Sequence, residues 1–313
     1  MLRWILLCTS LFLAGFARAE PATHDLDWFD ESRQRAVPVR LYWPQTDKPV
    51  ALVVFSHGIG GSRLGYSYLG EHFASQGMAS LHLQHVGSDR SLWGGNPLSL
   101  VGRLQDAAQE REALERVRDL SFALDQVLAH AEFGGRIDRR RIAAAGHSYG
   151  ANTAMLAAGA SLQREGRRLS VRDPRIKAAV LLSAPPFYGE ADPAAILRAV
   201  TLPTLHVTAT EDIIRIPGYY SPASDRVAVY EAIGSPFKAL AVFEGGSHSI
   251  FTNRGGSGGA ELNPKVKSAT KELALAFLQR VFEGRGEALQ RWPETHRTLL
   301  ARWTSPGTAA AVR

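Results

Sequence analysis

Hydrophobic and polar positions along this chain follow two different periods, and their alternation predicts a mostly parallel α/β sheet. Short apolar runs, typical of strands buried on both faces, are separated by longer stretches with helical spacing. An opening pair at 25–29 and 36–42 instead alternates apolar and polar positions, which favours an antiparallel edge. Six runs are candidates for the buried strands: 50–55, 78–83, 142–145, 178–182, 204–207 and 239–243. We therefore expect a mostly parallel central sheet with helices on both faces.

The longest segment of helical period spans 111–131 and ends before a Gly-Gly pair. Further helices are predicted at 66–76 and 266–283. No internal repeat and no linker rich in Pro, Gly or Ser divides the chain, so residues 20–305 are expected to form one domain. The part that follows the last helix is predicted either to dock on the domain or to stay partly mobile, and residues 306–313 are predicted to be disordered.

Residues 1–19 carry the pattern of a secretory signal peptide. A short basic start precedes an apolar run at 4–16, and Ala17-Arg18-Ala19 fits a small-x-small cleavage site. A membrane anchor is the alternative, but the run is shorter than the ~20 residues that a spanning helix needs. Cleavage after Ala19 predicts a mature chain that begins at Glu20, is periplasmic or secreted, and has no stable membrane span.

Composition narrows the class of protein further. The chain has 313 residues, a formal net charge of +6 and one cysteine, Cys8, which would leave with the signal peptide. The mature protein is therefore expected to fold without a disulfide. Cleavage would also remove Arg3 and Arg18, and the resulting charge of about +4 does not favour nucleic acid as a partner. The run Arg139-Arg140-Arg141 is interpreted as a solvated turn before a strand. The sequence indicates no particular oligomeric state.

A Gly-x-Ser-x-Gly pattern at 146–150 follows one apolar run and precedes a helix-forming segment at 151–160. A strand that turns sharply into a helix holds a serine hydroxyl out of the sheet, where a base and backbone N–H donors can reach it. Ser148 is therefore the predicted nucleophile. A glycine-rich turn leaves the first central strand, and we expect the N–H groups of Ile59 and Tyr149 to form an oxyanion hole.

Two further polar residues follow predicted buried strands. Asp212 comes after the run at 204–207, and His248 after the run at 239–243. The carboxylate can orient the imidazole, and the imidazole can take the proton of Ser148. Nucleophile, acid and base in this chain order is the arrangement of α/β-hydrolases. Glu211 competes for the acid role, and we choose Asp212 because its shorter side chain gives a stiffer hydrogen bond.

Four other histidines compete with His248 for the role of base. His57 is expected to hold the glycine-rich turn by hydrogen bonding, and His147 to point away from the nucleophile. His82 and His85 bracket a strand end, with no carboxylate in a motif beside them. No metal is expected, because the chain has no His-Glu-x-x-His motif, cysteine cluster or aspartate-rich loop.

Four motifs carry a resemblance to a known family: Ser56-His57-Gly58-Ile59-Gly60-Gly61, His85-Val86-Gly87-Ser88-Asp89, Gly146-His147-Ser148-Tyr149-Gly150 and Gly246-Ser247-His248-Ser249. The chain resembles the α/β-hydrolases called predicted dienelactone hydrolases, with platelet-activating-factor acetylhydrolases and bacterial polyester hydrolases as wider relatives. The resemblance implies an α/β-hydrolase fold and a Ser-Asp-His serine esterase that needs no cofactor, with oxyanion donors at Ile59 and Tyr149. Two features depart from these relatives. True dienelactone hydrolases use a cysteine nucleophile, and secreted polyester hydrolases commonly carry a disulfide.

The substrate is less clearly indicated than the chemistry. Trp93, in the stretch 87–105, and the pair Phe187 and Tyr188 are candidate walls of a substrate pocket, with core packing or surface cover as the alternative role of each. We expect a periplasmic or secreted enzyme that cleaves small-molecule or lipid esters of carboxylic acids through an acyl-enzyme. The alternatives are a serine peptidase or amidase, and a noncatalytic binding protein of the same fold.

Overall fold

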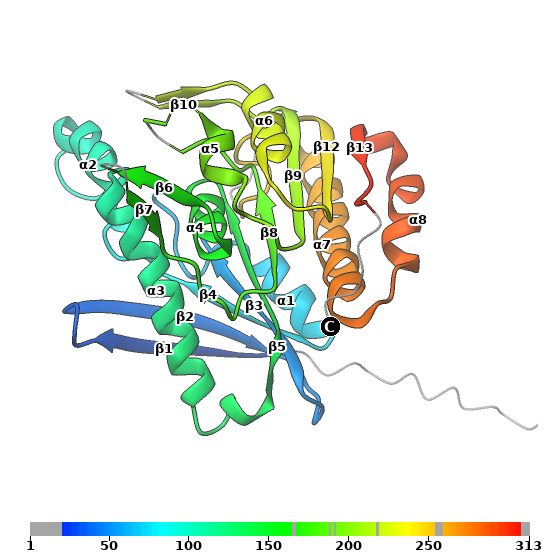
Figure 1. Cartoon of the computed structure of the whole chain (residues 1–313), viewed down its shortest axis with the longest axis horizontal. Helices are drawn as coiled ribbons and strands as arrows, with labels where there is room; N and C mark the ends of the chain where they lie inside the picture. The colour runs from blue at the N-terminus through cyan, green and yellow to red at the C-terminus, as the bar shows by residue number, and fades with distance from the viewer. Residues whose placement is uncertain are drawn as a thin grey trace, which may run out of the picture.

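The fold is built around one large β-sheet (Figure 1). The computed structural model describes residues 21–164, 167–187, 189–190, 192–216, 219–253 and 259–307. Within these residues, nine strands pair in the order β1-β2-β4-β3-β5-β8-β9-β12-β13. The strands from β4 to β12 in this order run parallel, whereas β1, β2 and β13 pair antiparallel at the two edges. The bounds are β1 Ala22–Asp30, β2 Arg35–Trp43, β3 Val50–Ser56, β4 Met78–Leu83, β5 Ile137–His147, β8 Ala178–Leu182, β9 Thr204–Glu211, β12 Lys238–Ser247 and β13 Leu300–Thr304.

The predicted sheet is confirmed. All six apolar runs are parallel strands, and the opening pair is an antiparallel edge in which β1 meets β2. The interpretation of Arg139-Arg140-Arg141 as a turn is wrong. These residues lie within β5, whose register against β3 shifts between Ile137 and Ile142, so that the arginines occupy the solvent-exposed start of a strand.

Helices cover both faces of the sheet (Figure 1). Each face has its own apolar core. One core lies between the sheet and α3, α4, α5 and α6, and the other between the sheet and α1, α7 and α8. The three predicted helices and the segment after the Gly-x-Ser-x-Gly pattern are confirmed as α1, α3, α7 and α4. The bounds are α1 Ser67–Ser75, α2 Leu100–Ala107, α3 Glu110–Ala129, α4 Tyr149–Ala158, α5 Pro193–Leu197, α6 Ser224–Ala232, α7 Gly259–Glu283 and α8 Glu287–Thr295.

The segment after α7 is docked on the domain. The indole of Trp292, on α8, is buried and donates a hydrogen bond to the carbonyl of Ala269 at 2.9 Å. The chain then returns as β13, which pairs with β12 and closes that edge of the sheet. Smaller elements are the hairpins β6 Ser161–Arg164 with β7 Arg167–Ser170 and β10 Ile214–Ile216 with β11 Tyr219–Ser221, and the short helices η1 Arg90–Trp93, η2 Pro97–Ser99, η3 Gly134–Arg136 and η4 Arg297–Leu299.

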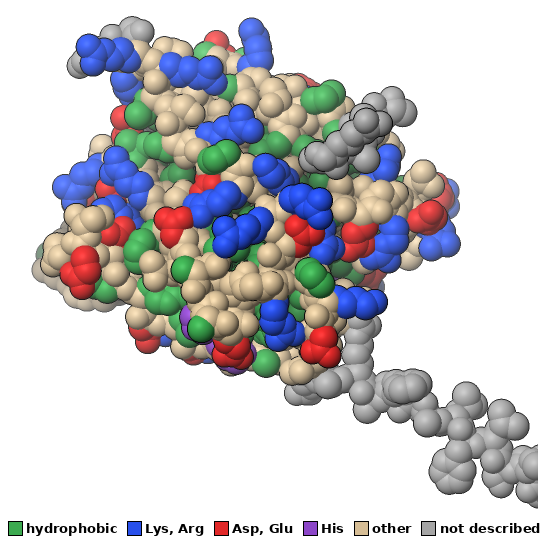
Figure 2. Space-filling model, turned by 60° about the horizontal axis from the view of Figure 1, so that its bottom comes forward, with side chains coloured by type: hydrophobic (Ala, Val, Ile, Leu, Met, Phe, Trp, Pro, Cys, Tyr) green, Lys and Arg blue, Asp and Glu red, His purple; other side chains and the backbone are tan. Residues whose placement is uncertain are grey.

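Both predicted terminal segments fall largely outside the described residues. The predicted signal peptide at 1–19 lies outside them entirely, and of the predicted tail only 306–307 are described. No helix within the described ranges is both long and apolar enough to cross a membrane. The face seen in Figure 2 carries Lys and Arg side chains together with Asp and Glu side chains.

Candidate active site

Ser148 lies on the sharp turn between β5 and α4. Its φ of 55° and ψ of −123° are strained for a residue other than glycine. Its N–H is held by the carbonyl of Leu182 at 2.9 Å. A glycine is required at position 150, because a Cβ there would lie 1.9 Å from the carbonyl oxygen of Ser56. The start of α4 can therefore approach the end of β3, which brings Ser148 beside the glycine-rich turn at 58–61.

His248 lies between Ser148 and Asp212 and contacts both. Its Nε2 is 2.7 Å from Ser148 Oγ, and its Nδ1 is 2.6 Å from Asp212 Oδ1. A carboxylate can only accept, so Nδ1 carries the proton and Nε2 is left to accept from the serine hydroxyl. Asp212 and His248 follow the neighbouring strands β9 and β12, whose carboxyl ends lie at the same edge of the sheet.

The surroundings of Asp212 keep it ionised. Its side chain is fully buried and also accepts a hydrogen bond from Thr208 Oγ1 at 2.7 Å. Burial works to raise the pKa of Asp212, but the hydrogen bond from His248 and the Arg226 guanidinium, 3.5 Å away, outweigh it and hold the pKa well below its usual value. Glu211, the competing carboxylate, is exposed at the end of β9.

His147 contacts the backbone of His248, the predicted base. Its Nε2 lies 2.8 Å from the backbone carbonyl of His248, so that nitrogen donates, and its Nδ1 accepts from the hydroxyl of Tyr66 at 2.8 Å. Burial, with His248 nearby, lowers the pKa of His147 to about 3. A neutral ring in this position ties the loop that carries His248 to the turn that carries Ser148.

The glycine-rich turn at 58–61 passes directly beside Ser148. A Cβ on Gly58 would lie 3.3 Å from the Cβ of Ser148. Within the described part of the chain, the N–H groups of Ile59 and Tyr149 donate to no protein acceptor, whereas the neighbouring Gly60 donates to the carbonyl of Ser88 at 2.8 Å. These two N–H groups belong to the two segments that meet at Ser148, the glycine-rich turn and the start of α4.

A second Ser-His-Asp chain lies behind this turn and is closed to solvent. His85 Nε2 is 3.0 Å from Ser56 Oγ, its Nδ1 is 3.0 Å from Asp119 Oδ2, and all three side chains are buried. His85 thus has the carboxylate partner that its sequence neighbourhood does not indicate. Its backbone N–H donates to Nε2 of His57, whose Nδ1 donates to the carbonyl of Gly58 at 2.7 Å. As expected, His57 holds the turn by hydrogen bonding.

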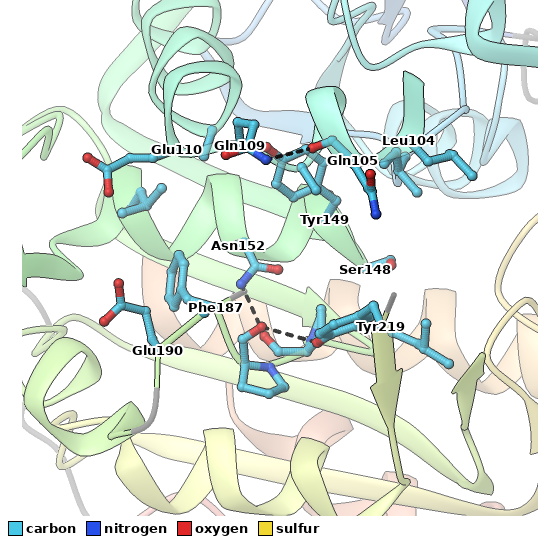
Figure 3. Close-up of a pocket in the computed structure, with 18 of the residues that line it drawn as sticks. Leu104, Gln105, Gln109, Glu110, Ser148, Tyr149, Asn152, Phe187, Glu190 and Tyr219 are labelled. Atoms are coloured by element: carbon cyan, nitrogen blue, oxygen red, sulfur yellow. Dashed lines mark hydrogen bonds between the residues drawn. The ribbon is translucent and has the colours of Figure 1, made fainter. Parts of the chain in front are cut away.

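A cavity of about 360 Å³ opens beside Ser148, and most of the side chains that line it are apolar (Figure 3). Ser148 lies at one end, and Glu110 and Glu190 lie at the other. Arg164 joins these two carboxylates, with Nε 2.6 Å from Glu110 and Nη2 2.5 Å from Glu190. The apolar lining residues are Ile59, Leu104, Ala108, Ala113, Leu114, Leu156, Leu162, Pro185, Pro186, Phe187, Ile214 and Ile216.

A second cavity, of about 380 Å³, shares Ile59, Ser148 and His248 with the first but is more polar. Its walls come from the glycine-rich turn and from the loop that follows His248. The polar side chains that line it are Ser62, Tyr66, Arg90, His147, Ser249, Thr252 and Asn253. Among the described residues, no group of three or more His, Cys, Asp or Glu side chains could hold a metal ion.

The predicted substrate residues fall in different places. Phe187 lines the apolar cavity. Trp93 does not line it, and instead donates from its indole to the carbonyl of Gly60 at 2.8 Å, where it packs on the outside of the glycine-rich turn. Tyr188 lies outside the described residues. The lining residues of the β6–β7 and β10–β11 hairpins were not predicted, because these strands of three or four residues are too short to show a period in the sequence.

Comparisons with known proteins point to ester hydrolases. A family model described as platelet-activating factor acetylhydrolase, isoform II, matches residues 37–93, which include the glycine-rich turn. Cutinase est2 of Thermobifida alba is 28% identical over 211 residues, a match that covers 66% of this chain and 56% of the cutinase. The two matches support the expected resemblance to platelet-activating-factor acetylhydrolases and polyester hydrolases, and neither bears on dienelactone hydrolases. The chain has the α/β-hydrolase fold and is similar to these two kinds of enzyme.

Proposed function

We propose that this chain is a serine hydrolase that cleaves carboxylic esters, with Ser148 as nucleophile, His248 as general base and Asp212 as the acid that orients it. The observation that carries the proposal is the hydrogen-bonded chain from Ser148 Oγ through both nitrogens of His248 to Asp212. The description of the matched family, an acetylhydrolase, and the name of the matched relative, a cutinase, favour the same class of reaction.

The reaction runs in two halves. Ser148 Oγ attacks the ester carbonyl while His248 Nε2 takes the hydroxyl proton, and the negative charge on the carbonyl oxygen is stabilised by the N–H groups of Ile59 and Tyr149. The C–O bond to the alcohol then breaks, and His248 gives its proton to the leaving oxygen. Water, activated by the same imidazole, hydrolyses the acyl-enzyme and restores the serine. Throughout, the ionised Asp212 stabilises the imidazolium and fixes its orientation.

We assign the acyl group to the apolar cavity and the alcohol to the more polar one. His248 must reach the leaving oxygen, and the residues that follow it, Ser249, Thr252 and Asn253, line only the polar side. Transfer of an aliphatic chain from water to walls of Leu, Ile and Pro is favourable. The substrate class that fits both sides is a small-molecule or lipid ester with an aliphatic acyl group. The pattern at 1–19 supports export to the periplasm or the medium.

Covalent labelling tests the proposal. After incubation with a fluorophosphonate, the intact mass should increase by one adduct, which peptide mapping should assign to Ser148. Ser148→Ala should neither label nor hydrolyse p-nitrophenyl esters, whereas Ser91→Ala, which changes an exposed serine on η1, should label and turn over normally. Labelling at another residue would contradict the assignment. A preference for amides over matched esters would favour a peptidase or amidase, and no labelling at all would favour a noncatalytic binding protein.

A further inference from the structure

Arg116, on α3, is one of the largest fully buried side chains among the described residues. A guanidinium is unfavourable in a protein interior unless hydrogen bonds and opposite charges surround it. The proposed reaction uses none of its atoms. Its contacts, however, lead to both segments that supply the oxyanion donors.

The first segment is the glycine-rich turn that carries Ile59. Nη2 of Arg116 donates to the carbonyl of His57, two residues before Ile59. Nη1 donates to Ser88 Oγ at 2.8 Å, and the carbonyl of the same serine accepts the N–H of Gly60 at 2.8 Å. The turn is therefore tied to the guanidinium on both sides of Ile59.

The second segment is the first turn of α4, which carries Tyr149. Nε of Arg116 donates to Thr153 Oγ1 at 2.9 Å, and that hydroxyl donates in turn to the carbonyl of Tyr149 at 3.2 Å. The central carbon of the guanidinium also lies 4.5 Å from the centroid of the Tyr149 ring, a cation–π contact. Tyr149 is thus held through its backbone and through its ring.

The charges around Arg116 keep it a cation. Ser88 Oγ passes a hydrogen bond on to Glu112 Oε1 at 2.8 Å, and Glu112 also pairs with Arg35 at 3.0 Å. Asp119 lies one turn further along α3 and is buried as well. Burial lowers the pKa of Arg116 to about 10. Because this value is still well above neutral pH, the side chain remains charged there.

We propose that Arg116 is a positioning residue that fixes the N–H of Ile59 and the N–H of Tyr149 relative to each other, and so preorganises the oxyanion hole. The inference rests on the function proposed above. Oxyanion stabilisation depends on donors that do not have to move as charge develops, and here the two donors come from segments that are far apart in the chain. The planar fork of arginine can bond both segments at once, which a lysine ammonium or a neutral side chain cannot do with the same geometry.

Replacement of Arg116 tests this role through the difference between transition-state and ground-state binding. Arg116→Lys should lower kcat by about 10- to 100-fold while KM changes by less than about threefold. The Ki of a boronic acid, which forms a tetrahedral adduct with the serine, should rise by a similar factor to the loss in kcat/KM. The Ki of the product alcohol, a neutral ground-state ligand, should stay the same, as should the shape of the pH profile of kcat.

Two further variants keep the test decisive. Leu124→Ala, on the same helix but packed on the sheet, should lower Tm and leave both Ki values unchanged. Thr153→Val keeps the shape of the side chain but removes one hydrogen bond of this network. It should lower kcat and raise the boronic acid Ki, each by about three- to tenfold, and it carries the test if Arg116→Lys does not fold. Folded Arg116 or Thr153 variants with normal boronic acid binding would overturn the inference. Ester hydrolysis by Ser148→Ala would instead overturn the proposed function.

Discussion

The length of the acyl chain is the substrate property on which the apolar cavity makes the sharpest prediction. Tyr149, Asn152 and Leu156 all line this cavity, and their spacing places them on one face of α4. The cavity therefore follows the helix for two turns beyond Ser148. At 1.5 Å per residue this is about 12 Å, the length of roughly ten extended carbon atoms.

The size of the effect follows from apolar burial. Each methylene moved from water into such walls contributes up to ~0.8 kcal/mol, or about fourfold in kcat/KM. At the far end, a longer chain meets the charged cluster of Glu110, Arg164 and Glu190, where this gain stops. We expect kcat/KM to rise from acetyl to about decanoyl esters and then to level off or fall.

The assay is a series of p-nitrophenyl esters with even acyl chains from two to sixteen carbons, each below its micelle concentration. Leu162→Trp should fill the far end and move the optimum to shorter chains by about two to four carbons. Leu98→Trp, at an exposed site on η2 outside the cavity lining, should leave the series unchanged. A flat series, a slope that continues beyond fourteen carbons, or a Leu162→Trp series identical to that of the parent would refute the assignment of this cavity to the acyl group.

Three other predictions concern the triad, the pH dependence of stability and export. Asp212→Asn should lower kcat by about 10⁴-fold because the imidazole loses its tautomer control, whereas Glu211→Gln should cost about tenfold or less; the reverse order in steady-state assays would show that Asp212 is not the triad acid. Burial lowers the pKa of His206 from 6.5 to about 3, so only the unfolded chain takes up this proton as pH falls below 6.5. The free energy of unfolding should therefore decrease by about 1.4 kcal/mol for each pH unit between pH 6 and 4 for each such histidine. In urea titrations at several pH values, His206→Gln should reduce the slope of the free energy of unfolding against pH by this amount. An equal slope for the variant and the parent would count against this reasoning. N-terminal sequencing of exported protein should begin at Glu20, and a membrane-bound form that keeps Met1 would contradict cleavage.

The sheet and the three triad positions could be predicted because parallel strands leave a strong signal. A strand buried on both faces is a continuous apolar run, and the carboxyl ends of neighbouring runs must meet at one edge. Ser148, Asp212 and His248 each follow such a run, and the structure brings them within hydrogen-bonding distance. Their catalytic roles remain a prediction until the variants are assayed.

Other features have no local signal. The β10–β11 hairpin contributes Ile214, Ile216 and Tyr219 to the apolar cavity, but strands of three residues are too short to show a period. The partners of Arg116 are drawn from segments 28 to 59 residues away, so its helical pattern reveals only that it lies on α3. The orientation of Trp93 depends on packing against Gly60, which spacing along the chain does not specify.

The docking of β13 on β12 has a consequence for the solubility of shortened chains. Without the residues after Glu283, the outer edge of β12 would present unpaired N–H and C=O groups along a strand whose side chains are mostly apolar. Such an edge is a template on which another copy of the chain can add a strand, and it lies immediately before the loop that carries His248. A chain ended at Glu283 is thus expected to aggregate through that edge, and fusion partners are better attached beyond residue 307 than in place of the last strand.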